Sequence, residues 1–155
     1  MVKSLISAAR LDVSPAHRRP SALRVLIASA AAVAGSLAAD AVIVAIGEAA
    51  IPATKGYTHF RFADYGKLTV IGVIIACIGW PIVARICAAP RWLFLRLAVL
   101  VTLVLLLPDA YIWYMGQPGD AVGILVVMHL AIGVVAYNCL VRLAPTSPLS
   151  DSGIS

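Results

Sequence analysis

The chain has 155 residues, of which 62% are hydrophobic and 12% are charged, and its mean hydropathy is +0.99. A typical soluble domain is about half apolar and roughly a quarter charged, so this composition excludes a soluble fold that must cover its apolar area with polar surface. The net charge of +5 comes without aromatic platforms or a recognisable nucleic-acid-binding module. We therefore expect the lipid bilayer as the main partner, and no nucleic acid.

Four apolar segments are each long enough for a helix that crosses about 30 Å of hydrocarbon, which takes about 20 residues. In chain order they cover about 25–46, 68–86, 93–115 and 121–141. The short joints AAPRW and GQPGD separate the last three segments, and both contain Pro or Gly, as helix breaks do. The sequence thus predicts an all-α integral membrane four-helix bundle over 25–143. A basic segment, 1–24, precedes it, and a short polar tail, 144–155, follows it.

Positive charge is concentrated on alternate sides of these segments. Five basic residues precede the first span, three lie around the second joint, and one ends the fourth span: Lys3, Arg10, Arg18, Arg19, Arg24, Arg85, Arg91, Arg96 and Arg142. The joint between the third and fourth spans carries only Asp120, and the first loop is nearly balanced in charge. Because cytoplasmic loops carry an excess of Lys and Arg, both termini are predicted to be cytoplasmic.

The first span has an alternative interpretation as a cleaved export signal. Twin arginines, Arg18 and Arg19, precede the apolar stretch, and the triplet ADA around Asp40 resembles a cleavage site. However, Pro20 and Ser21 follow the arginines where apolar residues would be expected, and the stretch is long enough to span. We expect a retained helix, and the other three spans keep their orientation in either case.

Three ionisable residues interrupt the apolar spans: Asp40, Asp109 and His129. At 1.5 Å per residue, Asp109 lies about 20 Å from Arg96, and His129 lies about 20 Å from Arg142. Asp40 lies about 24 Å from the cytoplasmic end of the first span by the same count. All three thus fall at nearly one height in the outer half of the membrane, where the second span contributes a threonine. The candidate site is this intramembrane polar layer: Asp40, Thr69, Asp109 and His129.

Three interpretations of the polar layer stay open. In the first, Asp109 and His129 hydrogen-bond across the last hairpin, and Asp40 or Thr69 completes a network that fixes helix register. In the second, the layer binds a proton, an ion or a small ligand, as in a transporter-like protein. In the third, these residues meet a partner, so that the chain is a homo-oligomer or an accessory or scaffold subunit of a larger membrane complex. No nucleophile motif, metal-ligand pattern or phosphate-binding loop occurs, so we expect no enzymatic activity, cofactor or metal.

The second span contains a stripe of small residues, and the loop before it contains two potential metal ligands. Gly72, Ala76 and Gly79 form one stripe of a helix, and small residues allow neighbouring helices to approach closely. In the preceding loop, THFRFADY offers His59 and Asp64 as metal ligands, but no metal motif surrounds them. We expect a solvated loop that rests on the headgroups.

The three cysteines show no paired spacing and are expected to be small buried hydrophobic residues: Cys77, Cys87 and Cys139.

Two segments from the second span onward are distinctive: KLTVIGVIIACIGWPIVARICAAPRWLFLRLAVLVTLVLLLPD and VVMHLAIGVVAYNCLVRL. Within them, three short elements match a known family: Pro90–Arg91, Leu107–Asp109 and Met128–Leu130. Through these elements the chain resembles the DUF6069 family of small four-helix membrane proteins of actinobacteria. The family has no established function, so the resemblance implies a four-helix architecture and a bacterial inner membrane, and no particular chemistry.

Overall fold

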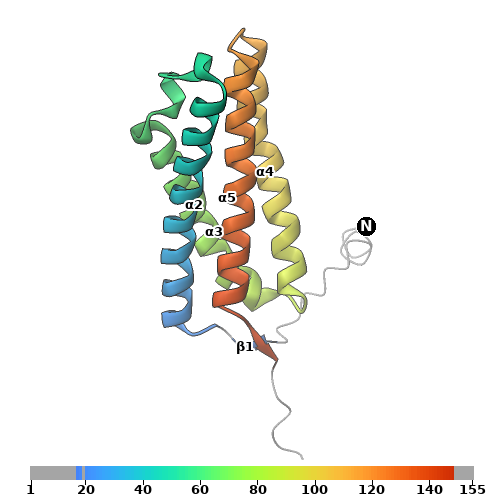
Figure 1. The fold of residues 1–155 in the computed structure, drawn as a ribbon. Helices are drawn as coiled ribbons and strands as arrows, with labels where there is room; N and C mark the ends of the chain where they lie inside the picture. Colours follow the sequence, from blue (N-terminus) through green and yellow to red (C-terminus); the bar gives the residue numbers. More distant parts are fainter. Residues whose placement is uncertain (1–16, 19, 149–155) are drawn as a thin grey trace, which may run out of the picture.

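The computed structural model describes residues 17, 18 and 20–148, and four long helices lie side by side in it as one bundle (Figure 1). The helices are α2 (Ala22–Ala50), α3 (Phe62–Ile86), α4 (Pro90–Tyr114) and α5 (Gly119–Leu143). Two short 3₁₀ turns connect α2 to α3, namely η1 (Pro52–Thr54) and η2 (Thr58–Phe60). All four helices are long and apolar enough to cross a membrane, which confirms the predicted all-α four-helix fold.

The described ends of the chain meet at one end of the bundle. A two-residue strand before α2, β1 (His17–Arg18), pairs antiparallel with a two-residue strand after α5, β2 (Ser147–Pro148). The joint between α3 and α4 lies at this same end, whereas η1, η2 and the turn between α4 and α5 lie at the opposite end (Figure 1). We call these the terminal end and the loop end. Most of the predicted basic segment, residues 1–16 and 19, and the tail residues 149–155 lie outside the described residues.

The helices begin and end at other residues than the apolar segments predict. Helix α2 begins at Ala22 because the side chain of Ser21 caps it, accepting a hydrogen bond from the backbone N–H of Arg24 at 3.3 Å. Helix α3 begins at Phe62, well before the predicted start at Leu68. Hydropathy detects the part of a helix that suits hydrocarbon, and the helical backbone continues past it into the polar boundary of the membrane.

Buried apolar side chains form two clusters, one toward each end of the bundle. The first, which we call the Trp80 cluster, lies toward the terminal end and contains Trp80, Phe94 and Leu140 among its largest members. The second, the Met128 cluster, lies toward the loop end and contains Met128 and Phe60. Exposed Leu, Ile and Val side chains cover the outer faces of all four helices. This arrangement suits a bundle whose solvent is lipid.

The most extensive helix contact joins α2 to α5. The buried face of α2 is a single stripe that contains mostly small residues: Ala28, Ala32, Ser36, Asp40, Val44 and Gly47. A Cβ atom at Gly47 would lie 2.5 Å from Cδ1 of Ile124 in α5, so the glycine is what lets the two backbones come this close. Small side chains at a membrane helix interface act in this way.

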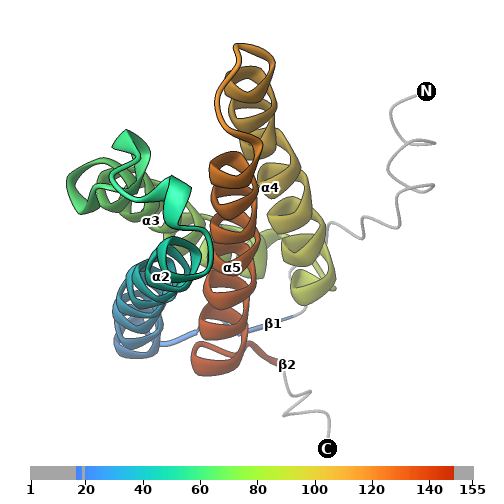
Figure 2. The same ribbon diagram turned by 45° about the horizontal axis from the view of Figure 1, so that its top comes forward.

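The stripe of small residues on α3, Gly72, Ala76 and Gly79, does not bring two helices together as expected. A Cβ atom built at Gly72 would meet nothing within 4 Å, and one at Gly79 would meet only the Phe94 ring, at 3.9 Å. Helices α3 and α4 diverge from their short connection toward the loop end (Figures 1 and 2). The small residues of α3 therefore line open space between the diverging helices.

The loop before α3 also departs from the predicted solvated loop. Thr54 and Phe60 are buried, and Phe60 packs in the Met128 cluster. The hydroxyl of Thr54 donates to the carbonyl of Ile51 at 2.8 Å, and two successive 3₁₀ turns satisfy the local backbone. The apolar side chains of this loop fold inward because the loop end of the bundle offers them a buried surface. The exposed side chains of Lys55 and His59 keep the other side of the loop polar.

Trp80 ties the end of the chain to the bundle. It is fully buried, and its indole N–H donates to the backbone carbonyl of Ala144 at 2.9 Å. We expect Trp80→Phe to lower the free energy of unfolding by about 1–3 kcal/mol, since it leaves a buried carbonyl without a donor. Unfolding followed by circular dichroism in mixed detergent micelles measures this. Trp113→Phe is the matched control because Trp113 is exposed, and an equal loss in both variants would contradict the assignment.

Candidate functional site

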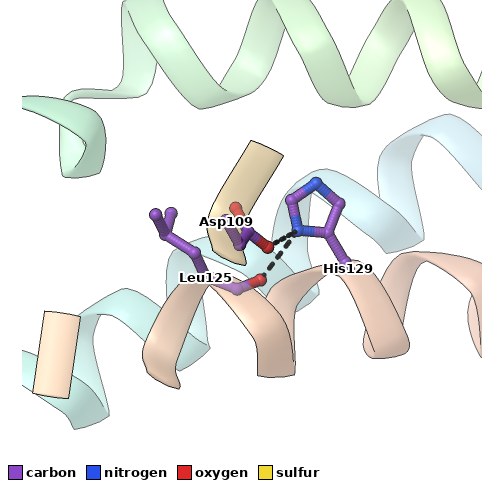
Figure 3. Close-up of polar contacts among 3 residues, drawn as sticks. All are labelled: Asp109, Leu125 and His129. Atoms are coloured by element: carbon purple, nitrogen blue, oxygen red, sulfur yellow. Dashed lines mark hydrogen bonds and ion pairs between the residues drawn. The ribbon is translucent and has the colours of Figure 1, made fainter. Parts of the chain in front are cut away.

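Asp109 of α4 and His129 of α5 meet inside the bundle (Figure 3). The carboxylate oxygen Oδ2 of Asp109 lies 2.9 Å from Nδ1 of His129. The same nitrogen lies 3.0 Å from the backbone carbonyl oxygen of Leu125, one turn earlier on α5. The ring N–H is aligned with the carbonyl, so the carboxylate contact is a close ion-pair or dipolar contact and not a second well-directed hydrogen bond. The contacts of Nδ1 with the Leu125 carbonyl and the Asp109 carboxylate together fix the imidazole ring with Nδ1 turned toward α4.

The two side chains meet because α4 and α5 form an antiparallel hairpin. The turn between them contains Gly116, whose φ of 91° is in the left-handed region that glycine adopts without strain. Asp109 follows Pro108, and α4 continues through this proline without a break. Further along the same pair of helices, Thr102 packs against Gly133, where a Cβ atom would lie 2.8 Å from the threonine hydroxyl. The hairpin thus holds Asp109 and His129 in register from both sides.

Asp40 and Thr69 form a second polar contact, between α2 and α3. The hydroxyl of Thr69 donates to Oδ2 of Asp40 at 2.6 Å, and both side chains are buried. Such a short distance is typical of a hydroxyl that donates to a carboxylate. The layer therefore consists of two pairs, each joining two helices, and no hydrogen bond between the two pairs is present among the described residues.

Several buried polar atoms at this level have no hydrogen-bond partner among the described residues: Ser36 Oγ, Asp40 Oδ1, Tyr57 OH and Asp109 Oδ2. Ser36 precedes Asp40 by one helical turn on the buried stripe of α2. Buried polar atoms in proteins are nearly always satisfied, so a cluster of unsatisfied ones marks a chemically distinct place in the bundle. Here that place is the level between the two apolar clusters.

Tyr57 covers this level from the loop end, and sequence reasoning did not identify it. Its ring makes edge contacts with His59 and Phe60, at centroid distances of 5.3 and 5.2 Å. Burial raises the pKa of the Tyr57 phenol, and the negative charge of nearby Asp109 raises it further. Tyr57 directly precedes the stretch THFRFADY, whose alternation of polar and aromatic residues did not indicate which rings turn inward.

Within residues 17, 18 and 20–148, no three His, Cys, Asp or Glu side chains are grouped so as to hold a metal ion. His59 and Asp64, the two loop residues considered as ligands, are not brought into such a group. All three cysteines are free thiols, with Cys77 and Cys87 buried and Cys139 half-buried.

The chain was compared with models of known protein families, with curated proteins and with solved structures, and nothing matched in any of the three comparisons. The resemblance to the DUF6069 family is therefore neither supported nor contradicted. The site must be interpreted from its own geometry.

The hydrogen bond from Thr69 is open to a direct test. We expect Thr69→Val to destabilise the fold by about 1–2 kcal/mol, because it removes the hydrogen bond that Asp40 receives and keeps the side-chain shape. Thr69→Ser, which retains the hydroxyl, should recover most of this loss. Titration with a denaturing detergent gives both free energies of unfolding. A Thr69→Val variant as stable as the parent protein would show that the contact contributes nothing to the fold.

Proposed function

We propose that the chain is a four-span protein of the bacterial inner membrane with both termini in the cytoplasm. Its support is the separation of charge along the bundle. The basic residues at the terminal end of the described chain are Arg18, Arg24, Arg85, Arg91, Arg96 and Arg142, and no acidic residue of the described chain accompanies them there. Toward the loop end, Glu48, Asp64 and Asp120 are matched by Lys55, Arg61 and Lys67, so no excess of basic residues is present there. Lys and Arg are retained on the cytoplasmic side during insertion, so the terminal end is assigned to the cytoplasm.

We further propose that the polar layer is a structural clamp that holds the outer ends of the helices together. The observation that carries this is the poor burial of α4. Its only buried residues are Pro90, Phe94 and Asp109, and the first two lie near its start. Over the rest of the helix, Asp109 is the one buried side chain, and its partner is His129. In lipid, apolar side chains gain little by leaving the bilayer for a helix surface, so a polar contact is what can favour the packed position of such a helix.

The polar layer gives no support for catalysis. The Thr69 hydroxyl does face the Asp40 carboxylate, but both side chains are buried, and the sequence contains no motif for nucleophilic, metal-assisted or phosphoryl chemistry. We therefore propose a non-enzymatic protein whose constant partner is the bilayer, with the resemblance to the DUF6069 family kept as part of the proposal. A role as an accessory subunit remains an alternative to a stand-alone protein, and a gentle pull-down from native membranes distinguishes them.

The orientation can be tested by chemical labelling. In a chain whose three native cysteines are replaced by alanine, we expect Lys55→Cys to react with a membrane-impermeant maleimide in intact spheroplasts. Ala89→Cys, in the joint between α3 and α4, should react only after the membrane is permeabilised. Both positions are exposed, so a difference in labelling reports the side of the membrane. The opposite pattern would reverse the proposed topology.

The clamp can be tested by a double-mutant cycle on Asp109 and His129. We expect Asp109→Asn and His129→Gln each to destabilise the fold, and the double variant to lose less than the two losses added together. A coupling free energy of about 1–2 kcal/mol is the expected size for a pair in direct contact. Asp120→Asn, at the exposed start of α5, serves as a control for loss of a carboxylate. If each single variant unfolds like the parent protein, the clamp is wrong.

A further inference from the structure

A cavity of about 240 Å³ is lined by residues of α3, α4 and α5. Its lining is almost entirely apolar, and the stripe of small residues on α3 forms one wall: Gly72, Ala76 and Gly79. An enclosed apolar cavity of about 150 Å³ is already able to hold a benzene ring. This one is large enough for a substituted aromatic ring.

The cavity is accessible from the lipid side of the bundle. Helix residues at its edge also belong to the exposed outer surface, among them Ile75 on α3 and Val101 on α4, which are 63% and 52% exposed. In a membrane-spanning bundle these faces meet acyl chains and not water. A molecule that enters by this route must first dissolve in the bilayer.

His129 makes one end of this apolar cavity polar. It belongs to the lining, and its side chain is 26% exposed, whereas its partner Asp109 is 6% exposed. Because Nδ1 is engaged with the Leu125 carbonyl and Asp109, the other ring nitrogen, Nε2, is on the edge turned away from Asp109 (Figure 3). Nε2 makes no hydrogen bond to another described residue.

The bonding of Nδ1 determines what Nε2 can do. An imidazole whose Nδ1–H donates to a carbonyl carries its lone pair on Nε2, and a carboxylate beside Nδ1 makes that lone pair a better acceptor. The matching ligand group is therefore a hydroxyl that donates a hydrogen bond. The apolar walls and the lateral access require the rest of the ligand to be hydrophobic.

We propose that this cavity binds a membrane-soluble phenol or quinol, with its ring against the α3 stripe and its hydroxyl donating to Nε2 of His129. This goes beyond the clamp, because it assigns the free edge of the same imidazole to a ligand. No bond is broken or formed in the ligand, and the site is a binding site only. Thr102 and Tyr137 also line the cavity, and the Tyr137 hydroxyl donates to the Arg91 carbonyl at 3.4 Å. Because an imidazole nitrogen accepts a hydrogen bond more strongly than a hydroxyl oxygen does, His129 is the main acceptor.

Binding is tested with the full chain in detergent micelles, using para-octylphenol as the probe and octylbenzene as its analogue without a hydroxyl. With isotope-labelled histidine, we expect para-octylphenol to cause a saturable shift of the His129 Nε2 signal in nitrogen NMR. Octylbenzene at the same mole fraction should shift it far less. The resonance is assigned by its loss in His129→Gln. Equal shifts with both compounds, or a shift that never saturates, would overturn the proposal.

Gly72→Leu provides the decisive variant. A Cβ atom at Gly72 meets nothing within 4 Å, so the leucine side chain fills the cavity without a backbone clash and leaves Asp109 and His129 in contact. We expect it to weaken para-octylphenol binding by about tenfold or more. Gly123→Leu is the matched control, because Gly123 also has open space around it and lies outside this cavity, on another face of α5. Unchanged binding in Gly72→Leu would overturn the site.

The clamp and the ligand site can fail separately. Stability of the Asp109 and His129 variants decides the clamp, whereas binding to Gly72→Leu, which retains both residues, decides the cavity. A stable Gly72→Leu protein that no longer binds the probe would support the site whatever the outcome of the double-mutant cycle.

Discussion

The constraint that orders this molecule is that a polar group inside a bilayer has no bulk water to bind, so a buried carboxylate needs a partner within the bundle. The two buried carboxylates obey it in pairs, Asp40 with Thr69 and Asp109 with His129. Both pairs lie between the Trp80 cluster and the Met128 cluster, so apolar packing closes the level from each side. The bundle is therefore two apolar cores joined through one polar level, and rotation of any helix would break a contact at that level.

Helix α4 shows how much depends on this level. The other three helices bury residues along most of their length, whereas α4 buries two residues near its start and then only Asp109. Its divergence from α3 leaves the cavity, and its hairpin with α5 is what keeps its loop-end half in place. A helix held at two points can leave space between them without losing its position. The clamp and the cavity are thus two consequences of the same sparse packing.

The sequence predicted the parts that follow from regular geometry. The rise of an α-helix, counted from the basic residues, placed Asp109 and His129 at one height, and the structure brings them to 2.9 Å. It could not predict that Asp40 takes Thr69 as its own partner, because rotation of one helix against another depends on the packing of all four. The helix ends were missed since hydropathy does not detect helical backbone outside the hydrocarbon. Tyr57 and Phe60 turn inward for a tertiary reason that no local pattern in the loop contains. The expectation that a neighbouring helix packs closely at Gly72 was wrong for the same kind of reason. Small residues allow close approach of two helices but do not cause it.

The two pairs in the polar level are chemically unequal, and the difference bears on function. Asp40 and its partner Thr69 are both buried, so neither side chain is open to a ligand. Asp109 is paired with an imidazole, whose two nitrogens can face in opposite directions, one to the helix hairpin and the other to the cavity. A threonine at position 129 could join α4 to α5 by a hydrogen bond, whereas an imidazole joins them and also presents a polarised acceptor to an apolar space. The structural role explains why a polar residue is present on α5, whereas the cavity explains why that residue is a histidine.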